Sequence, residues 1–230
     1  MGIMAKVPRS GEVKTRLVPP LSHEQASRLS ECFIQDVGAA IARAARARPE
    51  IHGFAVYAPE GAEQGLASLL PGDFGLVLQR GGDLGERLRH ATEDLLESGF
   101  HSVCLVNSDS PTLPPALLAE AARALEAPGD RLVLGPAADG GYYLIGLKRP
   151  HRRVFQDIAW STSTVLGSTL ERAREESLEV SLLPQWYDVD DVHSLRALRR
   201  ELFSPGHEAG GGAATRALLG SLLAVVDLLE

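Results

Sequence analysis

The regular alternation of short apolar runs with longer helical patterns is the feature that most constrains the fold of this chain. Runs typical of strands lie at 2–5, 52–58, 75–79, 101–107, 131–135, 142–147 and 178–183. Helical patterns lie at 22–48, 61–70, 83–98, 114–127, 163–177 and 192–203. Strands that alternate with helices predict a mostly parallel sheet covered by helices on both faces. We therefore expect an α/β fold, a three-layer α/β/α sandwich of the Rossmann-like kind.

The chain is predicted to form one domain with an appendage. Its 230 residues fit a single domain, for which roughly 100–200 residues are usual. We expect this domain to span 1–203 and the glycine-rich segment 204–215 to be a flexible linker. The segment 216–230 is predicted to form one apolar helix. That helix would pack on the domain or on a second subunit, which makes a homodimer possible.

Composition and charge exclude several classes of protein. Lys and Arg total 23 against 30 Asp and Glu, and the formal charge of −7 argues against a nucleic-acid coat, which needs a basic face. Cys32 and Cys104 are far apart and fit neither a disulfide framework nor a thiolate zinc site. The first residues lack the apolar region of a signal peptide. The apolar stretch 217–229 is too short and too interrupted to span a bilayer. We expect a cytoplasmic protein.

Four cations after the first predicted strand indicate a phosphate ligand. Doubly wound sheets bind their ligands outside the carboxyl ends of the strands. At that place Lys6, Arg9, Lys14 and Arg16 fall within eleven residues, around Gly11. Such cations could neutralise a polyphosphate, and the glycine backbone could approach its oxygens closely. The loop is neither a Walker A motif nor a GxGxxG motif, and the alternative is a solvated basic loop.

Carboxylates at two later positions predict a metal site. Asp109 follows the most apolar strand, in the sequence NSDSP. A carboxylate at such a strand end suits Mg²⁺, which takes one or two carboxylates and completes its shell with phosphate oxygens and water. Asp188, Asp190 and Asp191 precede a predicted helix, and one of them could complete the site. The alternatives are a local turn at Asp109 and helix capping by the later carboxylates.

A glycine pair beside a carboxylate indicates a further ligand contact. Gly140 and Gly141 lie between Asp139 and Tyr142, after a predicted strand. Without side chains, the two glycines would let the backbone run close to a ligand. The alternative is a hairpin turn, because Asp-Gly is also a strong turn signal.

A second glycine pair has two interpretations of the same kind. Gly81 and Gly82 leave room above the sheet for a flat ligand such as a base. Asp83 and Glu86, which follow, have the spacing of a capping box, so their side chains are expected to cap a helix. Further along the chain, the indole of Trp160 either stacks on a substrate ring or packs beneath a lid.

Six motifs in order resemble a known bacterial family. They are AKVPRSGEVKTRL, GGDLGERL, NSDSPTLP, LGPAADGGYYLIGL, IAWSTSTV and WYDVDD. Together they cover about residues 3–203 and resemble the DUF2064-type, glycosyltransferase-like proteins of GT-A fold, also described as transferases associated with radical-SAM and selenium genes. The Lys14–Leu17 unit and the Asp109 loop are also similar to 2-phospholactate guanylyltransferase. The layout is more distantly similar to molybdenum-cofactor and sugar nucleotidyltransferases.

The resemblance implies a role for most of these residues. Lys14 and Arg16 would grip a triphosphate as catalytic cations, beside the substrate-binding positions Lys6 and Gly11. Asp109 would be the metal aspartate and Asp190 a second contact to Mg²⁺ or Mn²⁺. The remaining substrate contacts are implied as follows: Gly81 and Gly82 near the base, and Asp139, Gly140, Gly141, Tyr142 and Trp160 toward the acceptor.

Two positions depart from the family pattern. Asn107 stands where the family usually has glycine, which leaves the Asp109 carboxylate in place. The first strand is shorter than the family's, so we expect a start upstream of Met1.

Three functions remain open at this stage. The first is nucleotidyl transfer from a nucleoside triphosphate to a small phosphorylated or hydroxyl acceptor, with release of pyrophosphate. The density of cations favours it, because a triphosphate carries more charge than a sugar diphosphate. The second is glycosyl transfer from a nucleotide-sugar, and the third is nucleotide binding without turnover. Asp109→Asn would separate the third from the others.

Overall fold

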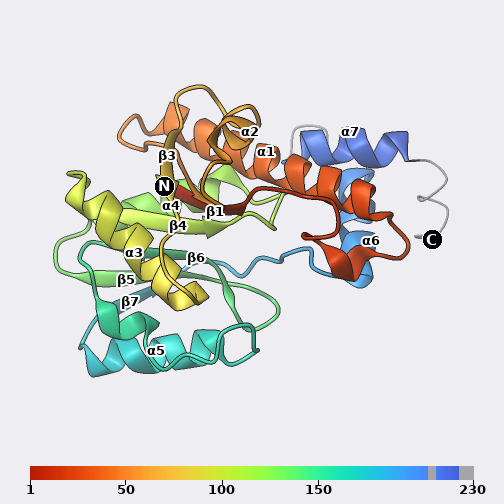
Figure 1. The fold of residues 1–230 in the computed structure, drawn as a ribbon. Coiled ribbons are helices and arrows are strands. Elements are labelled where there is room, and N and C mark those ends of the chain that lie inside the picture. The colour runs from red at the N-terminus through yellow and green to blue at the C-terminus, as the bar shows by residue number, and fades with distance from the viewer. Residues whose placement is uncertain (207–210, 223–230) are drawn as a thin grey trace.

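The computed structural model describes residues 1–206 and 211–222 and contains one seven-stranded sheet between helices (Figure 1). The strands are β1 Gly2–Lys6, β2 Phe54–Ala58, β3 Gly75–Leu78, β4 Val103–Asn107, β5 Arg131–Pro136, β6 Tyr142–Leu147 and β7 Glu179–Leu182. The helices are α1 His23–Ala47, α2 Glu63–Ala67, α3 Leu84–Glu97, α4 Pro115–Glu126, α5 Val165–Glu175, α6 Val192–Leu202 and α7 Ala213–Ser221. Short 3₁₀ turns form at η1 Thr15–Leu17 and η2 Arg152–Phe155.

The sheet has the order β3-β2-β1-β4-β6-β5-β7 and is mostly parallel, which confirms the predicted fold class. Among the strands of the described residues, only β6 runs antiparallel to its neighbours, β4 and β5. The reversal follows from the connection between β5 and β6, which spans only 137–141 and is too short for the crossover that parallel strands need. The hairpin interpretation of the Asp-Gly pair is therefore correct.

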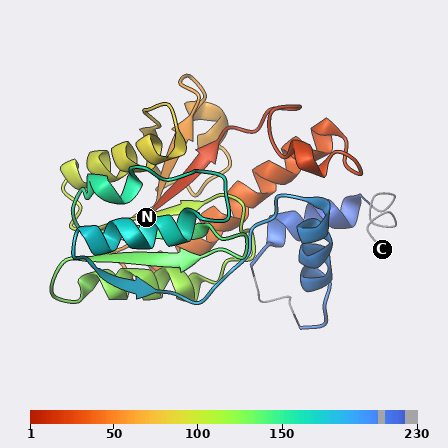
Figure 2. The same cartoon turned by 90° about the horizontal axis from the view of Figure 1, so that it is seen from below.

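Helices cover both faces of the sheet (Figures 1 and 2). On one face, Val37 of α1 and Leu118 of α4 pack with strand residues such as Ile3 and Val106 in one buried cluster. On the other face, α3, η2 and α5 pack with alternate residues of β2, β4, β5 and β6. Each fully buried leucine stabilises the fold by roughly 1.5–3 kcal/mol. The two clusters make the sheet a rigid support for the loops at its edge.

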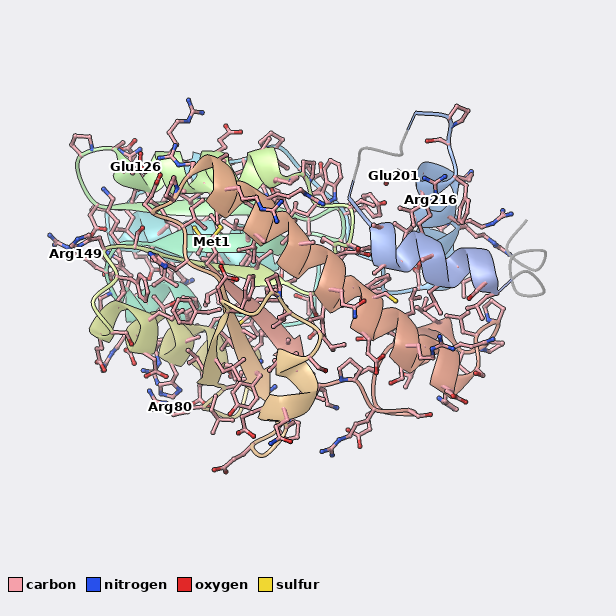
Figure 3. All side chains as sticks on the ribbon, turned by 90° about the horizontal axis from the view of Figure 1, so that it is seen from above. Met1, Arg80, Glu126, Arg149, Glu201 and Arg216 are labelled. Carbon is pink, nitrogen blue, oxygen red and sulfur yellow. The ribbon has the colours of Figure 1, made fainter. Side chains whose placement is uncertain are left out.

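A third apolar cluster lies beyond the carboxyl edge of the sheet. The first half of α1 extends past the strands and contacts η1, α6 and α7 there (Figures 1 and 3). Phe33, Leu29, Leu198 and Leu219 are almost wholly buried in this cluster. The cluster therefore anchors the segments that flank the loop after β1 and the loop before α6.

Local capping agrees with the predicted helix starts. Ser22 caps α1 through a reciprocal pair of hydrogen bonds with Gln25. Asp83 caps α3 by accepting from the Glu86 N–H at 2.8 Å. The Glu86 carboxylate accepts from the N–H of Gly82, one residue before the cap. The capping prediction for Asp83 and Glu86 is thus confirmed, with Gly82 in place of Asp83 as the donor.

The predicted start of the last helix is wrong by three residues. The helix begins at Ala213, so the last residues of the expected linker 204–215 form its first turn. The cause is Asp36 on α1, whose buried carboxylate accepts from the N–H groups of Ala214 and Thr215 at 2.9 Å and from the Thr215 hydroxyl at 2.6 Å. Residues 207–210 and 223–230 of the predicted linker and helix lie outside the described residues.

The described part of α7 packs on its own domain, against α1 and α6. Over residues 1–206 and 211–222, none of the helices has the length and apolar character needed to cross a bilayer.

We predict that Asp36→Ala lowers the free energy of unfolding by about 1–3 kcal/mol, because it leaves buried N–H groups of α7 without an acceptor. Urea denaturation measures the loss. Asp73→Ala is the matched control, because Asp73 is exposed in the loop before β3 and its loss should stay within about 0.5 kcal/mol. Equal stabilities for the two variants would contradict a capping role for Asp36.

Candidate active site

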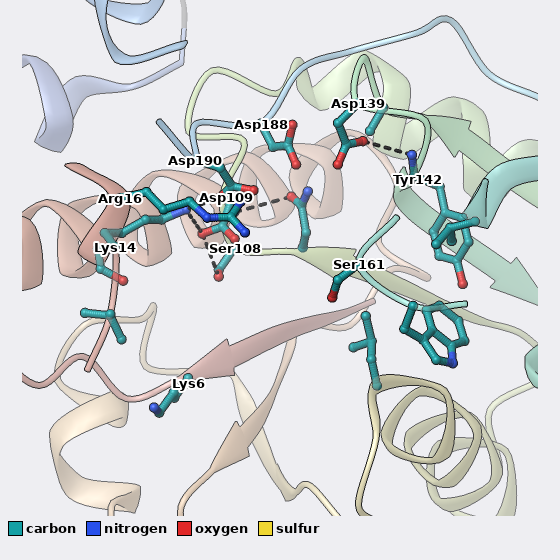
Figure 4. Close-up of a pocket in the computed structure, with 18 of the residues that line it drawn as sticks. Lys6, Lys14, Arg16, Ser108, Asp109, Asp139, Tyr142, Ser161, Asp188 and Asp190 are labelled. Carbon is teal, nitrogen blue, oxygen red and sulfur yellow. Dashed lines mark hydrogen bonds and ion pairs between the residues drawn. The ribbon is translucent and has the colours of Figure 1, made fainter. Parts of the chain in front are cut away.

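A cleft of about 530 Å³ opens at the carboxyl edge of the sheet (Figure 4). Its walls come from the segments after β1, β4 and β5, from the segment before α5 and from the segment before α6. These segments are far apart in the sequence and meet because parallel strands end at one edge. The predicted site residues on the wall are Lys6, Lys14, Arg16, Asp109, Asp139, Gly141, Tyr142, Trp160 and Asp190.

The centre of the cleft is an ion cluster around Lys14. The Lys14 ammonium lies 2.7 Å from Asp109 Oδ1 and 2.8 Å from Asp190 Oδ1. It also donates a hydrogen bond to the Val189 carbonyl at 2.8 Å, and the Phe33 ring lies 5.5 Å away. Only 7% of the Lys14 side chain is exposed. Burial lowers the pKa of Lys14, but the two carboxylates outweigh burial and raise the pKa above its usual value, so the ammonium is charged.

Local hydrogen bonds hold the Asp109 loop in place. The Asp109 N–H donates to Asn107 Oδ1 at 3.3 Å, and the Asp109 carbonyl accepts from the Val189 N–H at 2.9 Å. The second bond joins the loop after β4 to the segment before α6. The turn and the metal-site interpretations of Asp109 are therefore compatible, because the backbone makes the turn and the side chain faces the cleft.

Asp190 and Asp191 are adjacent in the chain but make different contacts. Asp191 caps α6 by accepting from the Ser194 N–H at 2.8 Å, and this bond lowers the pKa of Asp191. Asp190 is free of that role and contacts Lys14. The expectation that one aspartate caps the helix while another faces the site is consistent with this geometry.

Asp188 lines the cleft, although no separate role was predicted for it. Its half-buried carboxyl lines the cleft beyond Asp190. Burial, followed by repulsion from Asp139 and then from Asp190, raises the pKa of Asp188 to about 6. Asp139 is fixed by accepting from the Gly141 N–H at 2.8 Å. The cleft is therefore acidic from Asp190 through Asp188 to Asp139 (Figure 4).

The other two cations of the first loop reach solvent. Lys6 is exposed at the end of β1, 3.5 Å from Glu12 Oε2. Arg16 is an exposed residue of η1, and its side chain extends along the cleft near Asp109 (Figure 4). Lys6, Arg16 and the paired Lys14 make up a basic wall, and Asp139 and Asp188 make up an acidic end.

Four of the predicted glycines do not line the cleft. Gly11 sits at φ +81° in the exposed turn closed by the Glu12 N–H and the Arg9 carbonyl, so the turn explains it. Gly81 and Gly82 lead into the cap of α3. A Cβ on Gly140 would lie 2.2 Å from the Ser163 carbonyl oxygen, so this glycine permits close backbone packing.

The predicted aromatic residues pack against each other. Tyr142 and Trp160 meet edge to face with ring centroids 6.4 Å apart. The Tyr142 hydroxyl is buried, which raises its pKa. A Cβ on Gly85 would lie 2.6 Å from Trp160 Nε1, so Gly85 lets the indole pack on the start of α3. In the sequence, Gly85 is marked only as a glycine near the start of the predicted helix 83–98.

Asp109 and Asp190 are the two carboxylates of the cleft that are placed to bind one cation. Over the described residues, no cluster of three or more His, Cys, Asp or Glu side chains is arranged to hold a metal ion. Asp109 and Asp190 instead converge on one cation, the Lys14 ammonium, with 33% and 46% of their side chains exposed. Mg²⁺ commonly takes one or two carboxylates together with phosphate oxygens and water. The pair therefore supplies the number of carboxylates that Mg²⁺ commonly takes.

Comparison with known proteins identifies similar chains. Residues 40–162 match the family DUF2064, described as uncharacterized protein conserved in bacteria. A crystal structure from Desulfovibrio desulfuricans, described as a candidate nucleotide-diphospho-sugar transferase, is 33% identical with a TM-score of 0.84. The similarity covers 99% of this chain and 96% of that one. No curated protein matches the sequence.

More distant structures share the fold alone. The CMP:2-keto-3-deoxy-manno-octonic acid synthetase complexed with CTP is 12% identical, with a TM-score of 0.55 over 96% of this chain and 97% of that one. A cytidylyltransferase from Leptospira borgpetersenii is 11% identical, with a TM-score of 0.53 over 99% and 94%. The fold expected from the resemblance, that of nucleotide-diphospho-sugar transferases, is confirmed.

The raised pKa of Asp188 predicts a pH-dependent stability. The folded pKa of about 6 exceeds the value of about 3.9 for an unfolded aspartate, so the protonated carboxyl favours the folded state. This stabilisation is complete below pH 4 or so and is lost as the pH rises through about 6. Asp188→Asn should therefore raise the melting temperature above pH 6 and leave it unchanged near pH 4.

The neighbouring Asp191→Asn is the control for this measurement. The pKa of Asp191 is lowered, so its contribution is present above the unfolded pKa and is lost as the pH falls. Melting temperatures of both variants from about pH 2 to 8 separate the two signs, because the Asp191 contribution is lost only below about pH 4. An Asp188→Asn protein that is less stable than the wild type at neutral pH would contradict the raised pKa.

Proposed function

The chain belongs to the DUF2064 family, and from that premise we propose that it is a nucleotide-dependent transferase whose reaction is nucleotidyl transfer. A nucleoside triphosphate donates its nucleotidyl group to a small acceptor, and pyrophosphate leaves. The observation that carries the proposal is the ion cluster of Lys14 with Asp109 and Asp190, set beside Arg16 at the carboxyl edge of the sheet.

The basic wall of the cleft supports a triphosphate ligand. Lys6 and Arg16 are exposed and available for phosphate oxygens. Arg16 offers a planar fork that suits bidentate contact with a phosphate, whereas Lys6 and Lys14 act as point charges. Charge develops on the leaving pyrophosphate during the reaction, and fixed cations at that place stabilise it. Positioning and electrostatics then supply most of the rate without covalent chemistry by the protein.

Asp109 and Asp190 are the residues that would hold Mg²⁺ or Mn²⁺. When bound, the metal neutralises charge on the phosphates and helps to orient them. The chain keeps the two carboxylates at a fixed separation through the bond between the Val189 N–H and the Asp109 carbonyl. Asp191 contributes by fixing the start of α6 beside Asp190.

The acidic end of the cleft favours a hydroxyl acceptor over a phosphorylated one. Asp139 and Asp188 lie on the wall together with Ser161 and Thr162. Carboxylates and hydroxyl groups accept hydrogen bonds from an alcohol, whereas two neighbouring carboxylates repel a phosphate. The acceptor is therefore a small polyhydroxyl molecule or another neutral alcohol.

Glycosyl transfer is the second candidate function. The observation that favours it is the Desulfovibrio desulfuricans protein, 33% identical over 99% of this chain and described as a candidate nucleotide-diphospho-sugar transferase. A sugar diphosphate would use the same basic wall and the same carboxylate pair. The difference lies in the product, because glycosyl transfer releases a nucleoside diphosphate and nucleotidyl transfer releases pyrophosphate.

Calorimetry with the four nucleoside triphosphates and with UDP- and GDP-sugars, in Mg²⁺ and in EDTA, tests the proposal. We expect one triphosphate to bind tightly and to lose affinity in EDTA. Pyrophosphate release with an alcohol acceptor would then support nucleotidyl transfer. Preference for a nucleotide-sugar would favour the second candidate. Binding without turnover of any acceptor would favour a nucleotide-binding protein, and binding of no nucleotide would contradict the proposal.

We predict that Asp109→Asn lowers turnover by about 100-fold or more, because it removes one of the two carboxylates that would hold the metal on the phosphates. The melting temperature should stay within a few degrees of the wild type, since Lys14 retains Asp190 as a partner. Steady-state assays and thermal melts measure both effects. The exposed Asp73→Asn is the matched control, and an Asp109→Asn enzyme as active as this control would refute the role of Asp109.

A further inference from the structure

The Lys14 ammonium occupies the point on which Asp109 and Asp190 converge. It lies 2.7 Å and 2.8 Å from one oxygen of each carboxylate, and the Val189 carbonyl accepts a third contact at 2.8 Å. A divalent metal ion also binds oxygen ligands, so it would compete with the ammonium for the same three oxygens. Lys14 therefore places a cation of the chain itself between the two carboxylates.

A free divalent ion has two obstacles at this site. It must displace Lys14 from both carboxylates, because the ammonium and a metal cannot share that position without strong repulsion. The displaced ammonium then needs another anionic partner. Its side chain is only 7% exposed and lies beside the Phe33 ring, and a buried charge without a partner is strongly destabilising. Of the remaining carboxylates on the described cleft wall, Asp188 lies between Asp190 and Asp139, and Asp139 lies farther from Lys14 (Figure 4).

A nucleotide polyphosphate removes both obstacles at once. Its oxygens give the ammonium a new anionic partner, and they complete the shell of the arriving metal. Lysine has a flexible four-carbon stem, which allows the ammonium to move while its backbone stays in place. Arg16 remains exposed on the same wall and can make the first contact with the phosphates.

We propose that Lys14 closes the Asp109–Asp190 pair to free divalent metal, so that metal enters the site only together with a nucleotide polyphosphate. This inference rests on the proposed function and adds an order of binding to it. The protein would thereby stay metal-free in the absence of its nucleotide.

The test is Mn²⁺ binding to the nucleotide-free protein, read from the electron paramagnetic resonance signal of free Mn²⁺. We expect weak binding by the wild type and an affinity higher by about tenfold or more in Lys14→Met, because that change frees both carboxylates. Combining Lys14→Met with Asp109→Asn should abolish the gain. Equal Mn²⁺ affinities in a folded Lys14→Met protein and in the wild type, or tight binding by the wild type, would overturn the proposal.

Lys6→Met is the matched control for charge. It removes one cation from the same cleft, but Lys6 lies beside Glu12 and contacts neither carboxylate of the pair. Its Mn²⁺ affinity should change by less than about threefold, because exposed charges are screened. A gain in Lys6→Met equal to that in Lys14→Met would overturn the proposal, since overall charge would then explain both.

Two further measurements keep the outcome decisive. Thermal melts verify that Lys14→Met is folded, and Lys14→Gln, which keeps a hydrogen-bond donor without the charge, replaces it if it is not. The Mn²⁺ comparison uses no nucleotide, so equal affinities reject this inference alone. Absence of nucleotide binding by the wild type in Mg²⁺ would instead reject the proposed function.

Discussion

The contact of Lys14 with Asp109 and Asp190 is the interaction on which the arrangement of the cleft depends. It joins the loop after β1 to the loop after β4 and to a segment 176 residues further along the chain. A buried ammonium is tolerable only with such partners, and two carboxylates this close need a cation between them. Each loop therefore fixes the position of the others, and the hydrogen bond between Val189 and Asp109 holds the backbones in register.

Most of the fold could be predicted because its signals are local. Alternating apolar and helical patterns gave the layers, and the Ser22 and Asp83 caps marked helix starts. The start of α7 could not be predicted in the same way, because its capping carboxylate, Asp36, lies 178 residues away from Ala214. No local pattern carries that contact. The reversed strand β6 had a local signal, the short 137–141 connection, which outweighed the general expectation of parallel strands.

The candidate site was predictable only in part, for a related reason. Lys14, Asp109 and Asp190 line one cleft because strand ends share one edge of the sheet, but the direct ion pairs of Lys14 with the two carboxylates were not predicted. Predictions from glycine were weaker, since Gly11 serves a turn and Gly140 serves close packing on Ser163. A glycine indicates that the backbone adopts a positive φ or approaches another group closely, but it does not indicate whether a turn, packing or a ligand is the cause. The pKa of Asp188 depends on burial and on Asp139, and both arise from tertiary structure.

The distribution of charge gives the cleft a direction. The chain is acidic overall, with a formal charge of −7, yet Lys6, Lys14 and Arg16 lie toward one end of the cleft and Asp139 toward the other, with Asp188 between Asp190 and Asp139 (Figure 4). A molecule with a charged and a neutral end would bind in one orientation, with its phosphates on the basic wall. An alcohol at the acidic end would then face the phosphorus from the side opposite the basic wall. That orientation is what transfer between a polyphosphate donor and a neutral acceptor requires, so the polarity of the cleft and the proposed reaction support each other.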